Sequence, residues 1–350
     1  MKTEKEIAQK NSLRRKFRLS EFFAEYIIKS IAFLSFAMII LIFVFVFKET
    51  LPIFSPDYET KSNQEFLQSE TYGDEPGTAS PDQQISDYSS LLGVRKDIAD
   101  LDNLTGKEWQ PVGEEPKYGL IPIVVGSLKV TLIAVFIGAP LAILAAIFSA
   151  LFAPKKIKEL IKPAVELLAS FPSVVVGFFA LVTLATFLQT MFGWTFRLNS
   201  FVGGLAMALA VIPIIYTVTE DAITAVPKYM KEASFALGAN KWQTALFVIL
   251  PAATPGVFAA LLLGFGRAFG ETMIVLMATG NAPLTSFNPF EPVRTLSATI
   301  GAEMAEVVFG DTHYTVLFLI GSLLFIVTFL INAIAEFYVR AKLMKRFRGE

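Results

Sequence analysis

The chain of 350 residues contains no cysteine and a single histidine, His313. Without cysteine it can form no disulfide bond, no thiolate nucleophile and no cysteine-ligated zinc or iron–sulfur site. One histidine also leaves no second ring for a histidine metal cluster. We therefore expect no metal site, no cofactor and no enzymatic activity of the chain itself.

Charged residues are scarce as well, at 17% of the chain, whereas about 25% is typical of soluble domains. Hydrophobic residues make up 54%. Uncharged apolar runs of about twenty residues are typical of helices that span a bilayer. The composition therefore predicts an all-α, polytopic membrane protein that is surrounded by lipid and does not bind nucleic acid.

Six apolar segments predict six transmembrane helices. They lie at about 30–47, 120–153, 164–190, 201–218, 252–280 and 314–335. The first follows a basic segment, as in a signal peptide, but no small-residue cleavage site comes after it, so we expect it to be retained. The predicted parts are a basic N-terminus (1–29), the first helix (30–47), an acidic loop (48–118), a domain of five helices (119–340) and a basic tail (341–350).

Basic residues gather on alternate connections between these helices. The N-terminus, the connections near 154–163 and 220–250, and the tail hold 20 Lys and Arg, whereas the other connections hold 8. Because cytoplasmic loops are rich in Lys and Arg, we expect both termini to be cytoplasmic in an inner (plasma) membrane protein. The loop at 48–118 is then extracytoplasmic. Its 15 acidic and 6 basic residues favour a partly disordered loop over an ordered cap.

Nucleotide-binding motifs are missing from the chain. No Gly-Lys-Ser/Thr phosphate loop occurs, and after Gly264 and Gly266 the third glycine, Gly270, comes one place too late for a dinucleotide fingerprint. The chain should therefore not hydrolyse ATP itself.

Two opposite charges lie inside the fifth apolar segment. Arg267 and Glu271 are four residues apart, so they share one face if the segment is a continuous helix. Each costs about 2.5–3.5 kcal/mol to insert near the centre of a membrane helix. One interpretation is an ion pair that locks the helix against a neighbour. The other is a polar site on a substrate path, where the planar fork of arginine suits an oxyanion.

The connection from Glu232 to Pro251 is predicted to form two short helices with a turn at Gly238, a position expected to need positive φ. The apolar residues of the first helix are compatible with an amphipathic helix on the lipid surface. They are equally compatible with a surface that docks against another protein.

The same connection resembles the EAA motif of ABC importer permeases. The matching residues are Glu232, Ala233, Gly238, Leu250 and Pro251, and Ser234 stands where Ala is commoner. The resemblance covers about residues 120–340. It implies the MetI-like permease fold and a role for Glu232, Ala233 and Gly238 in coupling to a cytoplasmic ATPase.

The stretch from Gly266 to Met273 (Gly-Arg-Ala-Phe-Gly-Glu-Thr-Met), with Gly280-Asn281 after it, is similar to the PstC-type permease of the high-affinity phosphate importer. Residues 296–303 and His313-Tyr314 are also similar to that subunit. The resemblance implies a membrane path for inorganic phosphate that involves Arg267 and Glu271, and we place Thr272 of the same motif beside them. It further implies three partners: a homologous PstA-type permease, a PstB-type ATPase dimer and a periplasmic PstS-type phosphate-binding protein.

Other functions stay open at this point. Within the importer class, the substrate could be another oxyanion such as sulfate or molybdate. A secondary transporter would need no ATPase and has no use for the motif at 232–238. A membrane enzyme would need a cluster of titratable groups, which the composition disfavours.

Three further polar positions carry weaker expectations. Lys129 is predicted to reach from the outer end of the second helix to the membrane interface, with a role on the path as the alternative. Ser127 and Thr131 beside it could offer hydroxyl groups to an anion. His313 lies between Thr312 and Tyr314 and is predicted to be a surface histidine.

Overall fold

A computed structural model describes residues 19–54, 101–113 and 116–338. The predicted tail, most of the basic N-terminus and residues 55–100 of the acidic loop lie outside this part. The chain divides into two compact units between Glu49 and Thr50, and each is described by itself. Within the described residues, six helices are long and apolar enough to cross a membrane, so the predicted all-α class and the number of spans are confirmed.

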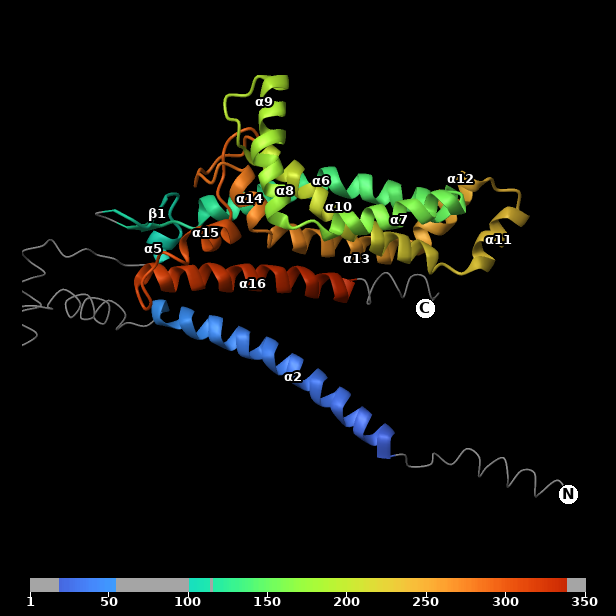
Figure 1. Cartoon of the computed structure of the whole chain (residues 1–350), viewed down its shortest axis with the longest axis horizontal. Helices are drawn as coiled ribbons and strands as arrows, with labels where there is room; N and C mark the ends of the chain where they lie inside the picture. Colours follow the sequence, from blue (N-terminus) through green and yellow to red (C-terminus); the bar gives the residue numbers. More distant parts are fainter. Residues whose placement is uncertain (1–18, 55–100, 114–115, 339–350) are drawn as a thin grey trace, which may run out of the picture. The chain divides into compact units, whose positions relative to one another are not determined.

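The described part of the first unit is the helix α2 (Leu19–Thr50, blue in Figure 1), whose last residue already belongs to the second unit. Its apolar residues cover all sides, and those between Ile31 and Phe45 are mostly exposed. A helix that is hydrophobic all round suits a lipid environment. The predicted first span at 30–47 lies within it.

The core of the second unit is built on three helices, α6 (Ile121–Ile147), α10 (Ser200–Thr224) and α13 (Leu250–Phe269). They pack side by side (Figure 1). Small residues allow the close approach of α6 and α10: a Cβ added at Gly204 would lie 2.5 Å from Ile133 Cγ2. Small residues at helix interfaces are typical of membrane proteins, in which burial from water does not drive helix association.

The predicted third span at 164–190 is wrong at its beginning. Residues 155–170 form a separate amphipathic helix, α7 (Lys155–Ser170), and the span runs from Ser173 to Phe192. Pro172 causes the division, because a residue before proline avoids the helical region, and Phe171 is extended (φ −64°, ψ 129°). The span itself consists of α8 (Ser173–Phe179), a π-helical segment (Ala180–Leu184) and α9 (Ala185–Phe192).

The predicted fifth span at 252–280 is displaced toward the N-terminus. The continuous helical stretch comprises α12 (Lys241–Thr244), a π-helical segment (Ala245–Ile249) and α13, which ends at Phe269. A separate short helix, α14 (Met273–Ala278), follows after Gly270, Glu271 and Thr272. Glycine is a weak helix former, and Gly266 and Gly270 lie at this end of α13. We call residues 270–272 the α13–α14 break.

Shorter elements cover one end of the second unit. They are α5 (Leu101–Leu104), the hairpin of β1 (Trp109–Gln110) and β2 (Lys117–Tyr118), and α15 (Leu296–Glu303). Trp109 pairs with Tyr118 across the hairpin, and both pack with Val316 and Leu317 of α16 (Thr312–Tyr338) in one apolar cluster. The described end of the acidic loop is therefore ordered.

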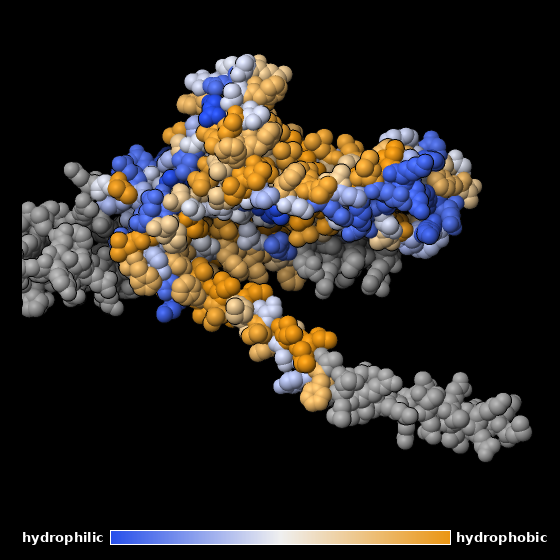
Figure 2. Space-filling view, viewed as in Figure 1, coloured by the Kyte–Doolittle hydropathy of each residue, from blue (hydrophilic) through white to orange (hydrophobic). Residues whose placement is uncertain are grey.

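The opposite end of the second unit carries α11 (Lys228–Ala236), α12 and part of α7 (Figure 1). Hydrophilic residues gather over these helices and over the hairpin end, whereas the surface between them is largely hydrophobic (Figure 2). Two polar ends separated by an apolar band are the pattern expected of a protein that spans a bilayer.

Candidate functional site

The first candidate site is the turn between α11 and α12. Gly238 has φ +82°, so the predicted positive φ is confirmed. Glu232 and Ala233 are exposed on α11, and Leu237 is 90% exposed beside the turn. We call these four residues the α11–α12 surface. The turn thus presents an exposed carboxylate and an exposed apolar side chain together at a polar end of the molecule.

Internal contacts hold the α11–α12 surface in place. The hydroxyl groups of Ser234 and Thr244 are 2.9 Å apart and buried, and this hydrogen bond joins α11 to α12. Asn240 and Gln243 form a reciprocal capping box at the start of α12. The Trp242 ring lies against Phe152, with 4.4 Å between ring centroids. The surface is therefore presented on a braced pair of helices.

The second candidate site is the α13–α14 break. Arg267 is exposed in the last turn of α13, and Glu271 and Thr272 are half-buried. Because α13 ends before Glu271, the two charges do not lie on one continuous helix. In the described part of the chain, neither the Arg267 guanidinium nor the Glu271 carboxylate makes a hydrogen bond or an ion pair within 4.0 Å. The geometry therefore gives no support to an ion pair that locks the helix.

The backbone of the break is supported from α15. Ser297 Oγ donates to the carbonyl oxygen of Glu271 at 2.6 Å. A Cβ added at Gly301 would lie 2.6 Å from Thr272 Cγ2, so α15 packs closely on the break. A backbone carbonyl released by a helix interruption inside an apolar region needs such a partner.

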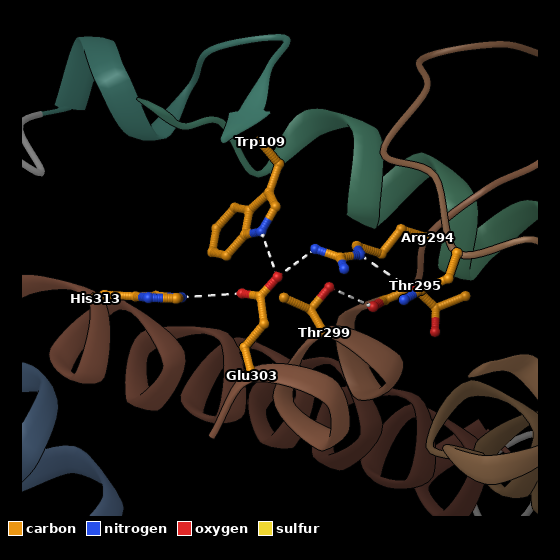
Figure 3. Close-up of polar contacts among 7 residues, drawn as sticks. Trp109, Arg294, Thr295, Thr299, Glu303 and His313 are labelled. Carbon is orange, nitrogen blue, oxygen red and sulfur yellow. Dashed lines mark hydrogen bonds and ion pairs between the residues drawn. The ribbon is translucent and has the colours of Figure 1, made fainter. Parts of the chain in front are cut away.

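A polar cluster around Glu303, which the sequence did not predict, lies near the hairpin (Figure 3). Trp109 Nε1 donates to Glu303 Oε1 at 3.2 Å, and Arg294 Nη1 forms an ion pair with the same oxygen. His313 Nε2 donates to Glu303 Oε2 at 2.9 Å. The prediction that His313 is a surface histidine is wrong, because its side chain is 12% exposed and its acidic partner lies ten residues earlier in α15.

The electrostatics of Glu303 follow from these partners. Burial raises the pKa of the carboxyl group, but the hydrogen bond from His313, the charge of Arg294 and the hydrogen bond from Trp109 outweigh burial, and the pKa lies below its ordinary value. The carboxylate is thus charged at neutral pH. The only signal in the sequence was that Glu303 and His313 fall in stretches similar to the phosphate permease.

Lys129 and its neighbours have structural partners. Lys129 Nζ donates to the backbone oxygens of Ser286 (2.8 Å) and Asn288 (2.9 Å), so the ammonium group holds the loop after α14. Ser127 Oγ donates to Ile123 O and accepts from Leu296 N, both at 2.8 Å. Thr131 is buried. Among the described residues, no hydrogen bond joins the hydroxyl group of Ser127 or Thr131 to residues 270–272.

Comparisons with known proteins agree with this architecture. Residues 138–342 match the family described as "Binding-protein-dependent transport system inner membrane component". The chain therefore belongs to this family of multi-pass inner-membrane transport components. Over 253 residues it is 36% identical to the phosphate transport system permease protein PstC of Mesorhizobium japonicum, covering 67% of this chain and 76% of that protein. Over 233 residues it is 35% identical to the probable ABC transporter permease protein YqgH of Bacillus subtilis, covering 67% and 75%.

Solved structures show the fold. The chain is similar to a chain of the inward-facing MetNI methionine ABC transporter, with a TM-score of 0.51, 21% identity and coverage of 63% of this chain and 95% of that chain. A bacterial ABC transporter that imports the acidic polysaccharide alginate gives a TM-score of 0.51 at 14% identity, covering 92% and 98%. The MetI-like permease fold expected from the EAA motif is confirmed.

Proposed function

We propose that this chain is the permease subunit of an ATP-driven importer and forms part of the membrane path for inorganic phosphate. The observation that carries the proposal is the pair of charges at the α13–α14 break: Arg267, in the last turn of a membrane-spanning helix, is exposed and makes no ion pair with Glu271, which lies in the break itself. Ionisable groups inside membrane spans are rare and mark substrate paths by default. The relatives named PstC support phosphate as the substrate.

The chemistry of the break suits a tetrahedral oxyanion. A guanidinium group stays charged at every physiological pH and offers two parallel donors to two oxygens of a phosphate. Thr272 adds a hydroxyl donor. The carboxylate of Glu271 repels an anion, so it weakens binding and favours release, as a transport site requires. Sulfate and molybdate are the rival substrates, because each presents oxygens in a similar arrangement.

We assign the proposed partners to the two polar ends of the molecule. The α11–α12 surface is proposed to dock into a PstB-type ATPase dimer, which places it and both termini in the cytoplasm. The hairpin, α5 and α15 then lie on the extracytoplasmic side, where a PstS-type binding protein delivers phosphate. A PstA-type permease completes the path. The EAA-like residues and the membership of a binding-protein-dependent family support this assignment.

The test is ATP hydrolysis by the assembled importer. The chain is reconstituted in liposomes with a PstA-type permease, a PstB-type ATPase and a PstS-type binding protein. Phosphate should stimulate ATP hydrolysis and enter the liposomes, whereas sulfate and molybdate should do neither. If only sulfate or molybdate stimulates ATP hydrolysis, that anion and not phosphate is the substrate. Uptake by this chain without the ATPase would point to a secondary transporter.

A further inference from the structure

We infer that Glu303 is a positioning residue for transport: by holding the end of α15, it fixes both ends of α14 and so sets the geometry of the α13–α14 break. The inference rests on the proposed function in one respect, since it takes the break to be part of the substrate path. The support of the break by Glu303 through α15 does not depend on the identity of the substrate.

Glu303 is the last residue of α15 and joins three segments that are distant in the sequence. Trp109 belongs to the hairpin, Arg294 precedes α15, and His313 lies in the first turn of α16. The Glu303 and Arg294 side chains are only 14% and 15% exposed. Removing the carboxylate would leave the Arg294 charge without its acidic partner in a mostly buried position, which is costly.

The beginning of α14 is held by the same helix. Ser297 and Gly301 are four residues apart on α15 and therefore lie on one face. Ser297 binds the Glu271 carbonyl, and Gly301 packs against Thr272. Any shift of α15 therefore reaches the break directly.

The end of α14 is held through Arg294. Arg294 Nε donates to Asn281 Oδ1 at 3.1 Å, three residues after α14 ends. Beside it, Val293 N donates to Thr279 O at 3.1 Å. Asn281 has φ +46°, a conformation in which a residue other than glycine needs support from its surroundings. Glu303 orients the arginine that supplies part of this support.

The length of α14 explains why this matters. A helix of six residues is far below the length at which isolated helices are stable in water, so its position depends on what brackets it. The contacts at the start of α14 come from α15, and those at its end come from Arg294, which is paired with Glu303. A force on the hairpin would pass through Trp109 to Glu303, from there through α15, and so to the residues proposed to meet the anion.

The experiment measures the accessibility of the break in the complete importer in membrane vesicles. The chain lacks cysteine, so Thr272→Cys gives a single reporter for an impermeant thiol reagent. Adding Glu303→Gln should raise the labelling rate about fivefold or more, because the support of α14 is loosened. Glu306→Gln is the matched control, since this exposed carboxylate lies three residues away. A second reporter, Met191→Cys in α9, should label at the same rate in every background.

Each possible labelling result either supports or overturns the positioning role of Glu303. The inference is overturned if Thr272→Cys is labelled at the same rate with Glu303→Gln as with Glu306→Gln. It is also overturned if Glu303→Gln raises the labelling rate of Met191→Cys, because that result shows a general loosening of the protein. Trp109→Phe removes the indole donor and part of the buried ring but leaves the Glu303 carboxylate with its two other partners, and it should give a smaller rise at Thr272→Cys. If Glu303→Gln does not reach the membrane, Trp109→Phe decides alone: a local rise supports the inference and no rise refutes it. The labelling requires no phosphate, so an error in the proposed substrate would not change it.

Discussion

The proposed role of the α11–α12 surface in docking the ATPase can be tested with a glycine substitution whose cost in backbone strain follows from the structure. Gly238 has φ +82°, and a Cβ added there would meet nothing within 4 Å. Gly193, at the end of α9, is its match: it has φ +67° and equally open space. At either position the Cβ of a valine therefore meets open space, and the cost that the two variants share is backbone strain. The strain is about 1–2 kcal/mol for an L residue in the left-handed region.

The two variants should differ although their strain is alike. A loss of about 1–2 kcal/mol is small against the stability of about 5–15 kcal/mol that is typical of native proteins, so Gly238→Val and Gly193→Val should both insert at normal levels. At Gly238 the strain is relieved by moving the turn that carries Leu237, and this displaces the α11–α12 surface. We expect the affinity for the ATPase to fall about tenfold, equivalent to about 1.4 kcal/mol, and transport to fall with it. Gly193→Val should keep its ATPase.

The assay is co-purification of the ATPase with the tagged permease, together with phosphate uptake in cells that lack their own permease. Membrane levels of both variants are compared by blotting. Equal losses in the two variants would mean that stability, and not docking, is affected. Normal association and uptake with Gly238→Val would remove the coupling role from this turn.

Three further predictions use the same uptake and membrane preparations. Arg267→Gln should reduce phosphate uptake about ten- to a hundredfold, the equivalent of a charged hydrogen bond of about 1.5–3 kcal/mol; Glu271→Gln in the same chain should not restore it, and recovery would return the pair to a structural role. Of two single-cysteine variants, Val112→Cys should react with an impermeant reagent in intact cells and Ala236→Cys should not; the reverse result would invert the topology. Because the pKa of Glu303 is lowered, the stability due to its charge is complete above the ordinary carboxyl pKa of about 4.3 and is lost as the pH falls through the lowered pKa. Thermal unfolding in detergent should therefore show less acid sensitivity with Glu303→Gln, and an unchanged pH profile would contradict the assignment.

Hydropathy and charge predicted the number of spans because each span needs only a local property, an uncharged run of sufficient length. The first and last residues of the spans were harder to predict from the sequence. Residues 164–170 are apolar enough to extend a span, but Pro172 separates them from it, and the basic residues of α7 keep that helix amphipathic. The glycines around Arg267 ended α13 early, which periodicity alone does not show.

The Glu303 cluster could not be predicted because its members come together only in the tertiary structure. Trp109 and Glu303 are 194 residues apart in the sequence, and Arg294 was the single basic residue of a loop with four acidic residues, so the sequence did not show which of them it pairs with. His313 lay within ten residues of its partner, but Glu303 ends one helix and His313 begins another, so no helical spacing relates them. Turn conformation at Gly238 was predictable because a single residue type carries the signal.

The contrast between backbone and side chains at the α13–α14 break is the strongest argument that its charges act on something outside this chain. An interrupted helix in an apolar region must satisfy the backbone groups that it releases, and here Ser297 does so for the Glu271 carbonyl. Within the described residues, the charged groups of Arg267 and Glu271 have no hydrogen-bond or ion-pair partner. An ion pair between them would lower the free-energy cost of inserting two charges into the membrane. The supported bend and the exposed guanidinium therefore favour the proposal that Arg267 meets an anionic partner outside the described residues, which on a transport path is the substrate.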